Sequence, residues 1–162
     1  MVSKIEAVIK RVIETLVFLL FAAMVVLVFA QVYTRFFTTK SLTWSEELSR
    51  FLMIWMVYLA SVLAYDSGIH IVVDSVVSLL KGRAKIAAAL VTNALMLLFV
   101  GLVLKGAISF LPKTALQRSP ANGIVMAYVY VAIPVSMALI GLVTVRKIVE
   151  AVGVLLKKEE AK

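Results

Sequence analysis

The chain has 162 residues, 63% of them hydrophobic, and a mean hydropathy of +1.06. Because soluble domains are about 45–50% apolar, this composition predicts a protein embedded in lipid. The absence of cysteine and the single histidine exclude a disulfide framework, thiolate metal sites and haem held by paired histidines. The basic residues lie between and beyond the apolar runs, so the net charge of +8 indicates contact with anionic membrane lipids rather than with nucleic acid.

Four apolar runs are long enough to cross a bilayer core, which takes about 20 helical residues. They cover approximately residues 12–33, 48–65, 86–104 and 124–145. A helix satisfies its own backbone hydrogen bonds, so it is the structure that such runs adopt in lipid. We therefore expect an all-α integral membrane protein in which residues 1–162 form one domain of four transmembrane helices.

The first run follows the basic residues Lys4, Lys10 and Arg11, as the core of a secretory signal peptide would. It is longer than the roughly 7–15 residues of a signal core, and no small-x-small cleavage motif follows its end. We expect it to remain as a membrane anchor.

The second run opens with Thr43, Trp44, Glu46, Glu47 and Arg50. Thr43 and Glu46 have the spacing of a capping box, and both glutamates suit the positive end of a helix dipole. Arg50 lies three and four residues after the glutamates, so it can form an ion pair within its own helix. Trp44 is expected to anchor the helix at the level of the lipid headgroups.

At the outer end of the first run, Gln31 and Arg35 are one helical turn apart. The connection to the second run is short, so Arg35 should come close to Glu46 and Glu47. We expect a pair between Arg35 and one of these carboxylates to fix the first helical hairpin.

Residues 69–80 follow the second run and place apolar side chains at helical spacing, with His70 and Asp74 on the opposite, polar face. The segment is too short to span, so we expect an in-plane amphipathic helix at the cytoplasmic surface, separated from the second span by Gly68. The alternative is the inner end of a long, tilted second helix. Two ligands do not make a metal site, so His70 and Asp74 are expected to contact a partner or the third helix.

Residues 105–123 form a mixed segment before the fourth run. Pro120 favours an extended Ser119 and suits the first turn of a helix, which predicts a helix start near Ala121. Further on, Pro134 cannot donate a hydrogen bond to the carbonyl of Tyr130, so a kink or a loosened turn is expected there.

Orientation follows from the basic residues. With the N-terminus inside, the cytoplasmic segments hold 11 lysines and arginines and the outer segments hold 6, which favours cytoplasmic termini.

Every Asp and Glu lies at a helix end or in a connection. Because a solute or proton carrier needs an ionisable group deep in a span, the chain is better suited to a scaffold than to an enzyme or an active centre.

Several motifs, taken in order, resemble the small membrane subunit, DctQ type, of tripartite ATP-independent periplasmic (TRAP) transporters. The residues that carry this resemblance are Gln31–Phe36 (QVYTRF), Trp44–Arg50 (WSEELSR), Trp55, Gly68–Asp74 (GIHIVVD), Ser119–Ala121 (SPA), Tyr130 and Pro134.

The resemblance implies a non-catalytic scaffold subunit in the bacterial or archaeal cytoplasmic (inner) membrane. Such transporters use a sodium gradient to import an organic acid, such as a sialic acid or a C4-dicarboxylate, which a periplasmic binding protein delivers. A large membrane subunit, DctM type, would carry the sodium and substrate sites, and this chain would hold no cofactor. Trp44, Glu46, Glu47, Arg50 and Arg35 would order the outer end, facing the binding protein. His70 and Asp74 would form the inner polar contact.

Two other functions remain open at this point. The chain could be a cofactor-free anchor or assembly subunit of a membrane enzyme complex, or a carrier that acts alone as a homodimer.

Overall fold

The computed structural model describes residues 2–38, 42–67 and 83–160 of the chain. Within these ranges, four long helices and one short helix make up most of the structure. They are α1 (Val2–Thr38), α2 (Thr43–Asp66), α4 (Arg83–Thr114), the short α5 (Met126–Tyr130) and α6 (Ala132–Glu160).

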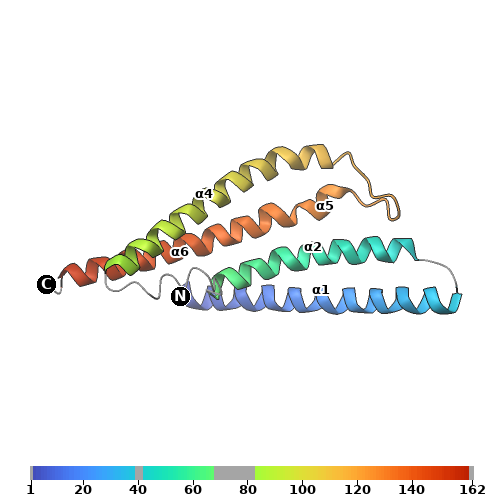
Figure 1. Cartoon of the computed structure of the whole chain (residues 1–162), viewed down its shortest axis with the longest axis horizontal. Coiled ribbons are helices and arrows are strands. Elements are labelled where there is room, and N and C mark those ends of the chain that lie inside the picture. Colours follow the sequence, from blue (N-terminus) through green and yellow to red (C-terminus); the bar gives the residue numbers. More distant parts are fainter. Residues whose placement is uncertain (1, 39–41, 68–82, 161–162) are drawn as a thin grey trace.

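The helices form two hairpins that lie side by side (Figure 1). Helix α1 packs against α2, helix α4 packs against α6, and α2 joins the two hairpins by packing against α6. The two chain termini, the end of α2 and the start of α4 lie toward one end of the bundle, which we call the terminal end. The end of α1, the start of α2 and the connection between α4 and α5 lie at the opposite, loop end.

All four long elements contain a stretch that is long and apolar enough to cross a membrane. These stretches are Ala7–Phe37, Thr43–Asp66, Ala87–Thr114 and Met126–Gly153, the last of which includes α5. The shortest has 24 residues, which corresponds to about 36 Å of helix against a hydrocarbon core of about 30 Å. The predicted all-α membrane protein with four spans is confirmed. The helices extend beyond the predicted limits except at the start of the fourth span, which begins at Met126 and not at residue 124.

Helices α2 and α6 form the centre of the bundle. In their most apolar windows 28% and 22% of the residues are buried, against 6% for α1 and α4. The buried apolar cluster draws on α1, α2, α4 and α6, and its members are Ile13, Leu59, Val62, Tyr65, Val100 and Ile140. Because lipid tails are as apolar as leucine, the apolar outer faces of α1 and α4 are compatible with a membrane.

The predicted capping box at Thr43 is wrong. Thr43 is already the first helical residue, the preceding Leu42 occupies the cap position, and no side chain caps this end. The Ser45 hydroxyl instead donates to the carbonyl of Leu42 at 3.1 Å. Because the helix begins one residue earlier than predicted, the Thr43 side chain does not have the geometry of a capping residue.

The predicted helix start near Ala121 is also wrong. Helix α4 continues through Pro112 to Thr114, and the next helix begins only at Met126. A tight turn lies between them, in which Ser119 donates its backbone N–H to Ile124 O at 2.9 Å and Met126 donates to Gln117 O at 2.9 Å. These cross-connections use the backbone groups that a helix would need for itself.

The interruption predicted around Pro134 is present. Helix α5 ends at Tyr130 and α6 begins at Ala132, with Val131 between them. Pro134 is the third residue of α6 and brings no N–H to the carbonyl of Tyr130.

The predicted in-plane helix over 69–80, with His70 and Asp74, lies outside the described residues.

Candidate functional site

The first of two polar clusters lies at the loop end and is centred on Glu47. A single carboxylate oxygen, Oε2, accepts four hydrogen bonds from the connection between α4 and α5. The donors are Ser119 Oγ at 2.9 Å, Ala121 N at 3.2 Å, Asn122 N at 2.9 Å and Asn122 Nδ2 at 3.0 Å. Asn122 Nδ2 also donates to the carbonyl of Trp44 at 2.9 Å. Glu47 therefore ties the start of α2 to the second hairpin.

The local sequence shapes the connection that surrounds this carboxylate. Gly123 has a φ of 67°, a left-handed conformation that favours glycine. Its N–H donates to Ser119 O at 3.0 Å, and Ile124 N donates to Ser119 Oγ at 3.2 Å. Ser119, which is only 4% exposed, thus accepts from its own turn while its hydroxyl donates to Glu47.

Two further contacts hold α5 at the loop end. Trp55 Nε1 on α2 donates to the carbonyl of Tyr128 at 3.2 Å. The rings of Phe110 and Tyr130 meet edge to face, with centroids 5.5 Å apart. Tyr130, a predicted interface candidate, therefore packs within the chain against α4.

The other residues predicted for the outer end lie at the loop end but have different partners. Glu46 and Arg50 form the predicted pair within α2, at 3.3 Å, with both side chains more than half exposed. Trp44 is 45% exposed. Arg35 is exposed, and no ion pair joins it to Glu46 or Glu47 within the described part of the chain. The structure does not support the predicted Arg35 pair, because the connection between α4 and α5 occupies Glu47.

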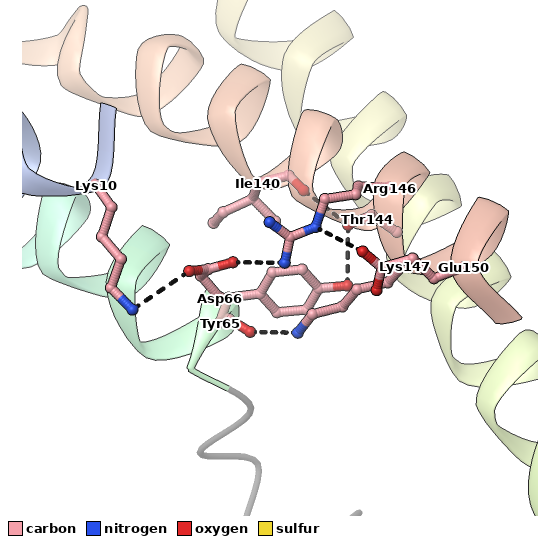
Figure 2. Close-up of polar contacts among 8 residues, drawn as sticks. All are labelled: Lys10, Tyr65, Asp66, Ile140, Thr144, Arg146, Lys147 and Glu150. Atoms are coloured by element: carbon pink, nitrogen blue, oxygen red, sulfur yellow. Dashed lines mark hydrogen bonds and ion pairs between the residues drawn. The ribbon is translucent and has the colours of Figure 1, made fainter. Parts of the chain in front are cut away.

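The second polar cluster lies at the terminal end, around Tyr65 at the end of α2 (Figure 2). Its hydroxyl donates to Asn93 Oδ1 on α4 at 3.2 Å and accepts from Thr144 Oγ1 on α6 at 2.9 Å. The Lys147 Nζ atom lies 4.3 Å from the centre of the tyrosine ring and also donates to the carbonyl of Tyr65. One side chain therefore connects three helices.

The neighbouring Asp66 is held by two bases from different helices (Figure 2). Arg146 Nη2 on α6 lies 3.1 Å from Asp66 Oδ1, and Lys10 Nζ on α1 lies 3.6 Å from Oδ2. Arg146 also pairs with Glu150 one turn later, at 3.4 Å. Asp66 is only 19% exposed, so its charge is well placed to hold α1 and α6 against α2.

Sequence reasoning did not single out the residues of this second cluster. The usable signal was the few polar residues inside otherwise apolar runs, among them Asn93 in the third run and Thr144 in the fourth. Such groups need hydrogen-bond partners in lipid, and here they find them both in carbonyls of their own helices and in Tyr65. What the sequence could not show was which faces of the helices meet.

Within the described residues, no group of three or more His, Cys, Asp or Glu side chains could hold a metal ion. The polar groups of both clusters bind one another and the backbone, and they bridge helices that are distant in the sequence. The arrangement is therefore one that fixes helices in a membrane.

The fold and the two clusters define a multi-pass membrane protein whose polar groups join its helices. The family described as "Tripartite ATP-independent periplasmic transporters, DctQ component" matches residues 24–153. The chain belongs to this family, and it is therefore a transporter component rather than an enzyme.

Two proteins of Haemophilus influenzae, both named as TRAP transporter small permease proteins, are similar to the chain along most of its length. One is 24% identical over 151 residues, covering 93% of this chain and 94% of the relative. The other is 27% identical over 133 residues, covering 82% and 81%.

Proposed function

We propose that the chain is the non-catalytic scaffold subunit of a sodium-driven, binding-protein-dependent transporter that imports an organic acid, such as a sialic acid or a C4-dicarboxylate. Its partners would be a large DctM-type membrane subunit, which would bind the sodium and the substrate, and a periplasmic substrate-binding protein. The complex would lie in the cytoplasmic membrane, with the terminal end of this chain in the cytoplasm.

The distribution of charge carries this proposal. None of the nine acidic residues falls within 15–45, 48–65 or 75–149, which include the middle of each span. A coupling ion or an anionic substrate needs charged or polar groups near the membrane midplane. The two polar clusters that connect helices, one around Glu47 and the other around Tyr65 and Asp66, lie near the two ends of the described spans, as a rigid support for a moving partner would require.

The proposed orientation rests on the excess of lysine and arginine toward the terminal end. The loop end would then face the periplasm and the binding protein. There, Glu47 presents the connection between α4 and α5 in one conformation through four hydrogen bonds, which would keep that surface constant as the partner moves.

The proposal can be tested by isolating the tagged chain in mild detergent and identifying what accompanies it. We expect a large multi-span membrane subunit, and uptake of an organic acid by vesicles only when that subunit, this chain and the binding protein are combined under an inward sodium gradient. Recovery of enzyme subunits instead would favour a membrane anchor. Transport by vesicles that contain this chain alone would contradict the scaffold role.

A further inference from the structure

A pocket opens between α1 and α6, over α2, toward the terminal end of the bundle. Its volume is about 270 Å³, and it is lined by residues from these three helices. Helices α1 and α6 each pack against α2 but not against each other in the described parts of the chain. The pocket is therefore a groove that the packing of the bundle itself creates.

The lining separates charge from apolar surface. Lys10, Asp66 and Arg146 are the charged members, and the rest of the lining is apolar. Ile13, Val62 and Val143 are apolar members that lie farther from the terminal end than the charged member of their own helix. At 1.5 Å per residue this offset is about 4.5–6 Å. Ala7 and Ile9 lie on the terminal side of Lys10, whereas the other apolar members lie deeper than the charged ones, so most of the apolar lining lies below a polar mouth.

We expect the mouth to lie near the depth of lipid headgroups, because Asp66 is the last residue of the second span and Lys10 lies in the first turn of the first span. The charged side chains that line the pocket are two bases, Lys10 and Arg146, and one acid, Asp66, and all three are drawn in Figure 2. Their sum is one positive charge. Lys10 retains 43% and Arg146 33% side-chain exposure, so both bases can reach an additional anion while they hold Asp66.

We propose that this pocket binds one anionic phospholipid, with its phosphate at Lys10 and Arg146 and part of one acyl chain along the apolar lining. The net positive charge of the mouth favours an anionic headgroup. The apolar lining that lies deeper in the membrane favours a molecule with an acyl chain over a free anion. The acyl chain gains little by leaving a bilayer that is equally apolar, so the headgroup contacts set the preference. The bound lipid fills the gap between α1 and α6, which do not pack directly against each other in the described parts of the chain. This inference does not depend on the transport role proposed above.

The first test uses the wild-type, full-length chain with whatever subunits copurify with it. It is reconstituted with equal amounts of phosphatidylglycerol and phosphatidylcholine, and the lipids retained after transfer to detergent are counted by native mass spectrometry. We expect retention of phosphatidylglycerol over phosphatidylcholine by about fivefold, the ratio that one basic contact near a membrane surface provides. Equal retention of the two lipids would overturn the proposal.

A competition arm separates a lipid site from a simple anion site. Inorganic phosphate in large excess should leave the retained phosphatidylglycerol in place, because it has no acyl chain to occupy the groove. Displacement of the lipid by phosphate alone would show that only an anion is recognised, and would overturn the proposal. Neither arm needs a substitution, so both remain decisive if a variant fails to fold.

A matched pair of variants then locates the site. Lys10→Gln and Arg11→Gln each remove one positive charge from adjacent positions of α1, but only Lys10 lines the pocket. We expect Lys10→Gln to reduce the preference to about equal retention of the two lipids and Arg11→Gln to leave it unchanged. Equal losses in both variants would indicate diffuse surface charge, and no loss in Lys10→Gln would place the lipid elsewhere. Either result would overturn the proposal.

Discussion

At the scale of single residues, the structure relies on a few side chains that satisfy several partners at once. Glu47 accepts four hydrogen bonds with one oxygen, and Tyr65 connects α2 to both α4 and α6. In a membrane, where exposed apolar surface gains nothing by association, such hydrogen bonds contribute to the choice between alternative helix packings. Substitutions at these two positions should therefore have larger effects than substitutions at equally polar neighbours.

Glu47→Ala should loosen the connection between α4 and α5, because it leaves the Ser119 hydroxyl and the Asn122 backbone N–H without their acceptor. We expect a thermal unfolding midpoint several degrees lower in detergent and faster proteolysis within residues 115–125. Glu46→Ala is the matched control, since its carboxylate has only the exposed pair with Arg50 and such pairs contribute little. Equal sensitivity of the two variants would contradict the role assigned to Glu47.

Tyr65→Phe removes only the hydroxyl that links Asn93 to Thr144. Asn93 Oδ1 loses its donor, whereas Thr144 Oγ1 keeps the carbonyl of Ile140, 2.7 Å away, as an alternative acceptor. We expect a loss of about 1 kcal/mol in unfolding free energy, the range measured for hydrogen bonds between membrane helices. Reversible unfolding in mixed micelles measures it. Tyr33→Phe, at a position that is 62% exposed, should leave stability unchanged.

At the scale of elements, the junction between α5 and α6 is the one interruption in a span within the described residues. Val131 N donates to Ala127 O at 2.9 Å and Val135 N to Val131 O at 3.2 Å, so the chain stays helical on both sides of the break. Contacts from α2 and α4 hold α5 next to the break, through Trp55 and Phe110.

Pro134→Ala should make this junction more helical, because an alanine supplies an N–H for the carbonyl of Tyr130. We expect slower hydrogen exchange of the backbone amides over residues 130–136, measured by mass spectrometry on the protein in detergent. Exchange over residues 95–104 of α4 serves as the internal control. Unchanged exchange at the junction would mean that the contacts of α5, rather than the proline, maintain the break.

At the scale of the whole molecule, the two hairpins are held together along α2 and α6 and secured at both ends. The Glu47 cluster does this at the loop end, and the cluster around Tyr65 and Asp66 does it at the terminal end. Helices α1 and α4 have the largest exposed apolar surfaces, which face lipid or another membrane subunit.

Asp66→Asn should weaken the joint between the hairpins, since it leaves Lys10 and Arg146 facing an uncharged group. Asp66 is partly buried, so we expect a loss of about 1–2 kcal/mol, between the values typical of exposed and buried pairs. The comparison variant is Glu150→Gln, which removes a second partner of Arg146 at a site that is 66% exposed, and it should have a smaller effect. Unfolding in mixed micelles ranks the two, and the reverse order would contradict the importance of Asp66.

The features of this protein differ in how far the sequence alone predicts them. The four spans and the break near Pro134 were predictable, because each depends on a local run of apolar residues or on one missing N–H. The Glu46–Arg50 pair was predictable for the same reason, as both residues lie on one helix face. The predicted capping box was wrong because the second helix begins one residue earlier. The predicted helix start at Ala121 was wrong because residues 117–126 form a turn whose backbone N–H groups at Ala121 and Asn122 bind the distant Glu47.

The sequence by itself therefore determined that the chain is an all-α protein of four membrane spans, and its motifs indicated the transporter family. Only the tertiary structure decided that Glu47 binds the connection to α5 rather than Arg35, and that Tyr65 joins three helices. Glu47 and its partners are 72–75 residues apart, and Tyr65 and Thr144 are 79 apart. Helix periodicity defines the faces of each helix, whereas the choice of which faces meet depends on the packing of all the helices together.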